Sequence, residues 1–149
     1  MLNQDFRDIL YAFCDEKVEF MVVGAYAMSF HGFPRATGDI DLWIRCSDSN
    51  APRVWNALVR FGAPLGDLTL DDLKARGTVF QIGVAPRRID ILTTISGVEF
   101  DDAQTGCKEI EIVGLKVPII GLADLLRNKK SAGRAKDRAD AAWLEGEDS

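Results

Sequence analysis

The stretch from residue 21 to residue 44, MVVGAYAMSFHGFPRATGDIDLWI, constrains the fold more than any other part of the chain. It predicts a strand that ends at Gly24, a short helix, a loop, and a second strand that begins with Asp39 and Asp41. Side chains alternate between the two faces of a strand, so these aspartates share one face, with their Cα atoms about 7 Å apart. Because apolar residues alternate with them, we expect the carboxylates to face a cleft.

Two carboxylates held side by side repel each other, and a divalent cation between them removes the repulsion. The pair Asp39 and Asp41 therefore suggests a metal site that handles phosphates. The alternative is a turn-and-cap pair at the start of a strand. The sequence pattern alone leaves both interpretations open.

Asp90 is a third acid, in the middle of the apolar strand RIDIL. An aspartate there is disfavoured, and it is costly if buried without a partner. If this strand neighbours the strand of Asp39 and Asp41, three carboxylates converge, as a two-metal site for nucleotidyl transfer requires. Asp90 would then also take a proton from an attacking hydroxyl. The alternative is an ion pair between Asp90 and Arg87 or Arg88.

Gly24 follows a strand and opens a helix, a geometry that presents backbone N–H groups to an anion. It could equally be a glycine that a tight turn needs. Arg35 and Thr37 stand just before the acidic strand, where they could contact phosphate or serve only the loop. His31, beside a glycine, is better explained as a loop or core residue than as a catalytic base.

The net charge of −5 argues against an extended nucleic-acid-binding surface. Residues 127–138, RNKKSAGRAKDR, nevertheless hold six basic residues and one acid, a local charge of +5. Such a patch can bind phosphates. It could also be a solvated face, with its cations near a helix C-terminus.

A chain of 149 residues with 47% hydrophobic residues suits a single domain, residues 1–149, with a real core. Three cysteines without a CxxC motif, and a single histidine, make a disulfide framework and a zinc site poor explanations. The N-terminus has no apolar signal segment, and no apolar run approaches the ~20 residues that span a bilayer. We therefore expect a cytoplasmic protein with no membrane partner.

Periodicity and turn signals predict a mixed sheet flanked by helices, of class α/β (α+β). Residues 17–23 and 39–44 are expected to be strands, and 108–113 and 116–120 edge-type strands. The further elements expected are strands over 78–84 and 88–94, a first helix capped by Asn3 or Asp5 that runs to about residue 15, and a short irregular or helical segment over 98–105. Helices are also expected over 25–30, 51–61, 70–74, 121–130 and 135–144.

The segment VVGAYAMSFHGFPRATGDIDLWI resembles the start of the DNA polymerase β-like nucleotidyltransferase superfamily, and within it the AbiEii-like group. That family has a Gly-Gly or Gly-Ser turn, an R-x-T-x-D-[IL]-D strand and a lone carboxylate on a later strand. The similarity covers roughly residues 20–142. The positions that match the motifs are Gly24, Ala25, Arg35, Thr37, Asp39, Asp41 and Asp90.

The resemblance implies a nucleotidyltransferase fold with two C-terminal helices. It implies Mg²⁺ or Mn²⁺ as cofactor, held by the three aspartates, and an NTP as substrate. It also implies that Lys130, Lys136 and Asp137 lie near the nucleotide. The implied partners are an acceptor, which could be RNA, tRNA, a protein or a small molecule, and a partner subunit that completes the acceptor surface.

The family includes nucleotidyltransferase toxins, so a toxin–antitoxin or phage-defence role follows from the resemblance. Ala25 departs from the family pattern, because it lacks the hydroxyl that some members place on a phosphate. That departure slightly favours a rival interpretation, a catalytically silent binding or antitoxin module. A metal-dependent nuclease also uses clustered carboxylates, but it does not readily explain the turn at Gly24.

Overall fold

The computed structural model describes residues 3–33, 38–84 and 87–148. Their strands form one mixed sheet in the order β3-β4-β2-β1-β6-β5, which confirms the expected fold class. The strands are β1 (Phe20–Val23), β2 (Ile40–Ile44), β3 (Val79–Ile82), β4 (Ile89–Leu92), β5 (Lys108–Ile112) and β6 (Leu115–Ile119). The helices are α1 (Gln4–Asp15), α2 (Gly24–Phe30), α3 (Asn50–Phe61), the 3-10 helix η1 (Asp71–Lys74), α4 (Phe100–Gly106), α5 (Leu122–Ala132) and α6 (Ala135–Asp148).

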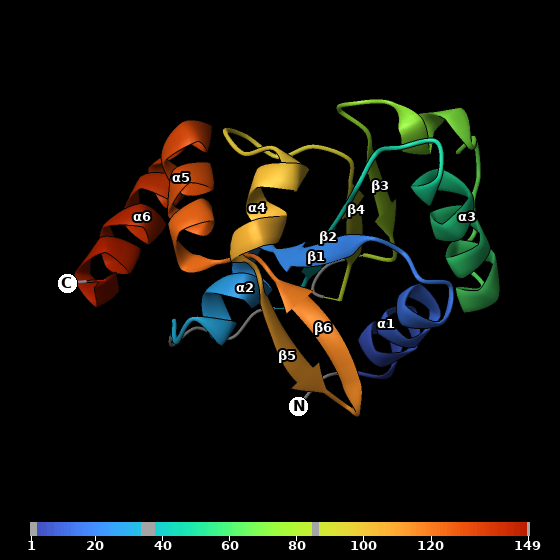
Figure 1. The fold of residues 1–149 in the computed structure, drawn as a ribbon, viewed down its shortest axis with the longest axis horizontal. Coiled ribbons are helices and arrows are strands. Elements are labelled where there is room, and N and C mark those ends of the chain that lie inside the picture. The colour runs from blue at the N-terminus through green and yellow to red at the C-terminus, as the bar shows by residue number, and fades with distance from the viewer. Residues whose placement is uncertain (1–2, 34–37, 85–86, 149) are drawn as a thin grey trace.

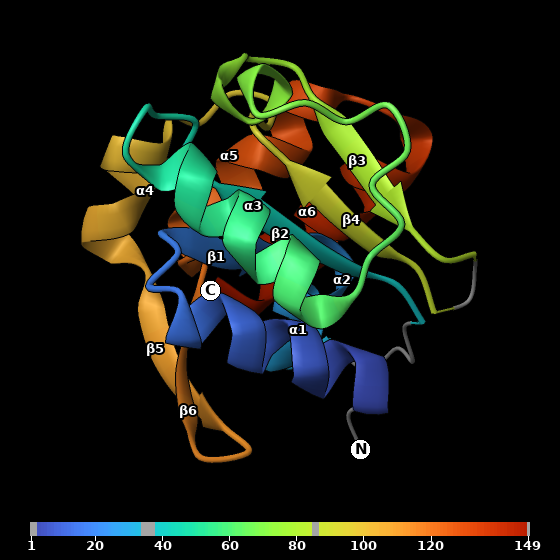
Figure 2. The same ribbon diagram turned by 90° about the vertical axis from the view of Figure 1, so that its right-hand side faces the viewer.

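Helices cover the sheet from both sides. In Figure 1, α1 and α3 lie to the right of the sheet and α5 and α6 to its left, and Figure 2 shows α1 and α3 side by side in front of the strands. The apolar stripe of α1, with Phe6, Ile9 and Leu10 at helical spacing, is fully buried. Val54 and Leu58 of α3 are buried in the same core. The apolar sides of α1 and α3 therefore belong to the same hydrophobic core as the central strands.

The register of β2 positions the acidic residues. β2 pairs with β1 in the antiparallel sense and with β4 in the parallel sense, and Asp41 lies directly opposite Asp90. Opposed residues of a pair project from the same face, so both carboxylates point away from the face that carries Leu42 and Ile91. Leu42 and Ile91 are buried. The expected neighbourhood of the two acidic strands is thus confirmed.

Two expected elements differ from the structure. Lys17 has a φ of 56° and the amide of Val18 donates to the carbonyl of Phe13, so this segment closes the end of α1 and β1 begins only at Phe20. Residues 116–120 were expected at a sheet edge. β6 instead lies between β1 and β5, because Val22 pairs with Ile119.

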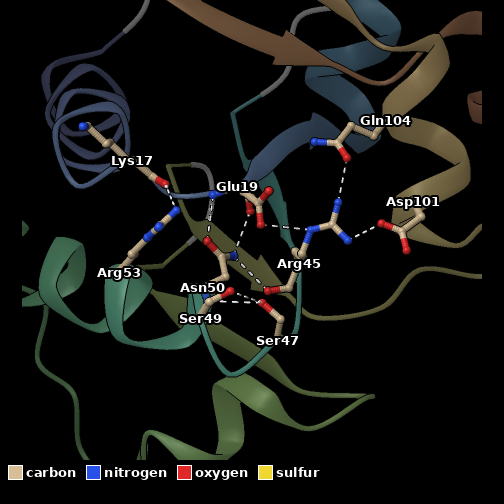
Figure 3. Close-up of polar contacts among 9 residues, drawn as sticks. All are labelled: Lys17, Glu19, Arg45, Ser47, Ser49, Asn50, Arg53, Asp101 and Gln104. Carbon is tan, nitrogen blue, oxygen red and sulfur yellow. Dashed lines mark hydrogen bonds and ion pairs between the residues drawn. The ribbon is translucent and has the colours of Figure 1, made fainter.

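A buried asparagine fastens the helical layer to the two central strands. Asn50 accepts from the amide of Glu19 through Oδ1 at 2.8 Å, and its Nδ2 donates to the carbonyls of Glu19 and Arg45 at 3.0 and 2.8 Å. Figure 3 shows this side chain between the entry to β1 and the exit from β2. Because every polar atom of the amide is used, the start of α3 and both strands hold one relative position.

None of the helices in the described part of the chain is both long and apolar enough to cross a membrane.

Candidate active site

A cavity of about 850 Å³ lies on the face of the sheet opposite the α1–α3 layer, and carboxylates that point away from the core line it. Asp39, Asp41 and Asp90 lie on its sheet side, with Gly24 and Ala25 beside them. Its opposite side comes from α5 and α6, and the lining residues there include Asn128, Lys129, Arg134, Lys136, Asp137 and Asp140. Acidic groups of the sheet thus face three basic and two acidic side chains on the opposite side of the cavity.

Arg88 stands among the three aspartates. Its Nε and Nη2 donate to the two carboxylate oxygens of Asp90 at 2.8 and 3.2 Å, and Nη2 lies 3.7 Å from Oδ2 of Asp39. Its backbone amide donates to Oδ1 of Asp39 at 2.9 Å. The hydrogen bonds to Asp90 raise the pKa of the Arg88 guanidinium. The pairing of Asp90 with Arg88, one of the alternatives from the sequence, is therefore present.

Asp41 carries the strongest electrostatic strain in the site. Burial raises its pKa to about 7, and the charge of Asp90 and a hydrogen bond with that carboxylate add to the rise. Lys129 opposes the shift and Asp39 adds a little to it. At neutral pH Asp41 is therefore protonated for much of the time, as expected of a buried carboxyl beside another carboxylate.

The donor set fits a hard divalent cation. Carboxylate oxygens from Asp39, Asp41 and Asp90 are the ligands that Mg²⁺ and Mn²⁺ prefer, and an ion would replace the proton on Asp41. Within residues 3–33, 38–84 and 87–148, no three acidic, histidine or cysteine side chains already stand in an arrangement that could hold a metal. The chemistry of the site fits, while Arg88 now occupies part of its space.

Gly24 lets the chain pass close to Asp41. Its φ of +68° lies in the left-handed region, and a Cβ on this residue would overlap Oδ2 of Asp41. No side chain caps the N-terminus of α2, which is only seven residues long. The turn can therefore offer a ligand backbone groups close to Asp41, but not the dipole of a long helix.

Lys129 lines the cavity, although the sequence pattern placed it only within the basic segment 127–138 and singled out Lys130 and Lys136 instead. Its Nζ lies 3.5 Å from Oδ1 of Asp137 and 3.3 Å from Oδ2 of Asp140, and the residue is only 8% exposed. Arg134 donates to Asp137 through Nε at 2.6 Å, and this bond is the main reason why the pKa of Asp137 is lowered. The available signal was helical spacing, because Lys129 follows the buried Leu125 by four residues on α5.

The two lysines that the sequence singled out lie in different places, one at the cavity and one away from it. Lys136 lines the cavity, whereas Lys130 is not among its lining residues and pairs with Glu145 at 2.9 Å. Arg35 and Thr37 lie outside the described residues.

His31 has a structural contact, as expected. Its Nε2 lies 2.8 Å from the carbonyl oxygen of Ile120, which links the end of α2 to the strand layer.

Comparisons with solved structures identify the fold. A candidate nucleotidyltransferase from Thermotoga maritima, TM1012, superposes with a TM-score of 0.64 at 18% identity, over 95% of this chain and 91% of that chain. The antibiotic-resistance factor ANT(2″)-Ia superposes with a TM-score of 0.61 at 13% identity, over 94% of this chain and 80% of that chain. No protein-family profile and no curated protein matches the sequence. The chain has the fold of the nucleotidyltransferases.

Substitution of Gly24 tests the close approach to Asp41. Gly24→Ala should lose more stability than Gly66→Ala, a matched control with a φ of +55° and open space around it. The left-handed backbone costs an alanine about 1–2 kcal/mol at either position. Overlap with the carboxylate should add at least about 1 kcal/mol at Gly24 alone. Urea unfolding measures both, and equal losses would contradict the close approach.

The raised pKa of Asp41 predicts a pH dependence of the metal-free protein. Between pH 3.8 and about 7 the folded state retains a proton that the unfolded state has released. The free energy of unfolding should therefore decrease as pH rises through this window. Asp41→Asn should remove that decrease, and Asp67→Asn, at an exposed loop position, should not. Urea unfolding at several pH values in EDTA measures it, and an Asp41→Asn profile parallel to wild type would refute the assignment.

Proposed function

We propose that residues 1–149 form a single-domain, Mg²⁺- or Mn²⁺-dependent nucleotidyltransferase that moves an NMP from an NTP to an acceptor hydroxyl. One observation carries the proposal: Asp41 and Asp90 oppose each other on neighbouring strands and share a cavity with Asp39, in a chain with the nucleotidyltransferase fold.

Each aspartate has a role in this proposal. Asp39, Asp41 and Asp90 would hold the divalent ions, which when bound neutralise charge on the triphosphate and in the in-line transition state. Asp90 would accept the proton of the attacking hydroxyl. A bond then forms between the acceptor oxygen and the α-phosphorus, the bond from that phosphorus to the bridging oxygen breaks, and pyrophosphate leaves.

The phosphates would lie between the turn at Gly24 and the basic helices. Gly24 and Ala25 would contribute backbone amides, since Ala25 has no hydroxyl to offer. Lys129 and Lys136 line the opposite side of the cavity, and we assign to Lys129 the phosphate contact that the resemblance implied for Lys130. Its burial between two aspartates fixes the ammonium in position before a nucleotide arrives.

Arg35 and Thr37 precede β2 directly in the sequence. We retain for them the role of contacting phosphate or substrate that the sequence motif implies.

The candidate acceptors are RNA, tRNA, a protein hydroxyl and a small molecule, and a partner subunit would complete the acceptor surface. ANT(2″)-Ia is an antibiotic-resistance factor, so antibiotics belong among the small molecules to be tested. A toxin–antitoxin or phage-defence role would require a nucleic-acid or protein acceptor in the cell.

One observation favours the alternative of a catalytically silent module. Because Arg88 neutralises Asp90 directly, the acidic cluster is tolerated without a metal ion, and its presence does not by itself demand one. Ala25 also favours this alternative, because it lacks the hydroxyl that some members of the family place on a phosphate.

A transfer assay tests the proposal. Incubation with each α-³²P-labelled NTP, Mg²⁺ or Mn²⁺, and total RNA, cell protein or small-molecule fractions should move label to one acceptor class. Asp39→Asn should lower the rate at least about a hundredfold, because the loss of a metal ligand removes several kcal/mol of transition-state stabilisation. Asp67→Asn serves as the matched control. If Asp39→Asn retained the full rate, the mechanism would be wrong, and if wild type neither transferred label nor bound NTP, the silent module would be the better explanation.

Adjacent lysines give a second test. Lys129→Gln should weaken binding of a non-hydrolysable NTP about 10- to 100-fold, as expected for loss of a hydrogen bond to a charged group. Lys130→Gln should leave binding unchanged, because Lys130 pairs with Glu145 outside the cavity. Isothermal titration calorimetry measures both, with thermal melting as the check on folding. Equal effects of the two substitutions would contradict the assignment of Lys129.

A further inference from the structure

A cationic side chain of the protein already occupies the oxygens to which the proposed metal would bind. Arg88 engages both carboxylate oxygens of Asp90, at 2.8 and 3.2 Å, and its Nη2 lies 3.7 Å from Oδ2 of Asp39. Asp90 is only 7% exposed, so little of its carboxylate is open to other partners. A bidentate contact of this kind is the strong form of an arginine–carboxylate pair.

The backbone of Arg88 and its side chain have different constraints. The amide of Arg88 donates to Oδ1 of Asp39 at 2.9 Å, and its carbonyl accepts from the amide of Ile40 at 3.0 Å. These bonds fix the backbone to the start of β2. The side chain, by contrast, is 31% exposed. The guanidinium can therefore turn toward solvent without any shift of the strands that carry the aspartates.

We propose that Arg88 is a built-in counter-ion that competes with the divalent cation for Asp39 and Asp90 and thereby sets the metal affinity of the site. This inference rests on the proposed function, because it presumes that the aspartates bind a metal. In the metal-free protein Arg88 neutralises the acids and holds them together. When a divalent ion arrives, the guanidinium gives up its contacts with the carboxylate oxygens, since both cations need the same lone pairs.

The competition has a consequence opposite to that of a simple supporting residue. Removal of a residue that only positions the ligands weakens metal binding. Removal of a competing cation strengthens it, because the metal no longer has to displace an existing ion pair. The direction of the change in metal affinity therefore separates the two roles.

The experiment is a titration of the full chain with Mn²⁺ in the absence of nucleotide. Electron paramagnetic resonance monitors the binding of Mn²⁺. Arg88→Gln should bind Mn²⁺ about tenfold more tightly than wild type, a ratio within the range expected for the loss of a charged hydrogen bond. Arg87→Gln is the matched control, with the same change in net charge one residue away at an exposed position. It should bind Mn²⁺ as wild type does.

The outcomes separate the two proposals. If wild type binds Mn²⁺ and Arg88→Gln binds equally or more weakly, Arg88 does not compete and this inference is overturned, while the metal site stands. An equal gain in affinity for Arg87→Gln would mean that only net charge matters, which also overturns it. If wild type, Arg87→Gln and Arg88→Gln all fail to bind Mn²⁺, the metal site itself is wrong and both proposals fall.

Thermal melting provides a second readout and a check on folding. Metal-free Arg88→Gln should melt below wild type, because the acids lose their counter-ion, and saturating Mn²⁺ should raise its Tm by more than it raises that of wild type. A purely structural role predicts the same increase in both. Arg88→Lys keeps the positive charge but cannot form a bidentate contact with a carboxylate, so it should have an intermediate Mn²⁺ affinity. This variant decides between the two roles if Arg88→Gln does not fold.

Discussion

The repulsion between two opposed carboxylates shapes the rest of this structure. Parallel pairing of β2 with β4 places Asp41 directly against Asp90, and burial prevents water from screening the two charges. Burial and the neighbouring Asp90 raise the pKa of Asp41 to about 7, so a proton on Asp41 relieves part of this repulsion, and the guanidinium of Arg88 relieves the rest by pairing with Asp90. In the proposed function a divalent cation would take the place of both, so that the buried acids would serve as a binding site.

The rest of the fold keeps that register in place. A slip of one residue between β2 and its neighbours would turn Asp41 into the apolar layer of α1 and α3 and bring Leu42 to the cavity. The buried amide of Asn50 ties the entry of β1 to the exit of β2, and the α1–α3 layer packs on the other face. Gly24 then allows the chain to return within contact of Asp41.

The cavity is electrostatically divided. The sheet side carries Asp39, Asp41 and Asp90 beside Arg88, and the side of α5 and α6 carries Lys129, Arg134 and Lys136, with Asp137 and Asp140 holding Lys129 in place. A ligand that carries both phosphate groups and a bound cation matches this division, because its cation faces the acids and its free phosphate oxygens face the bases. A nucleoside triphosphate with its metal has that character, whereas a purely cationic or purely anionic ligand would meet one unfavourable side.

The sequence by itself determined the elements and most of the acidic site. Alternation in DIDLWI placed Asp39 and Asp41 on a cleft-facing side, and an acid inside RIDIL marked Asp90, because charges in apolar strands are tolerated only at special positions. It left Arg87 and Arg88 both open as partners of Asp90, although strand alternation puts Arg88 on the same face as Asp90. It also singled out Lys130, although Lys129 follows the buried Leu125 by about one helical turn. Only the tertiary structure decided which sides of β4 and α5 face the cavity, because their packing depends on contacts between residues that are distant in the sequence.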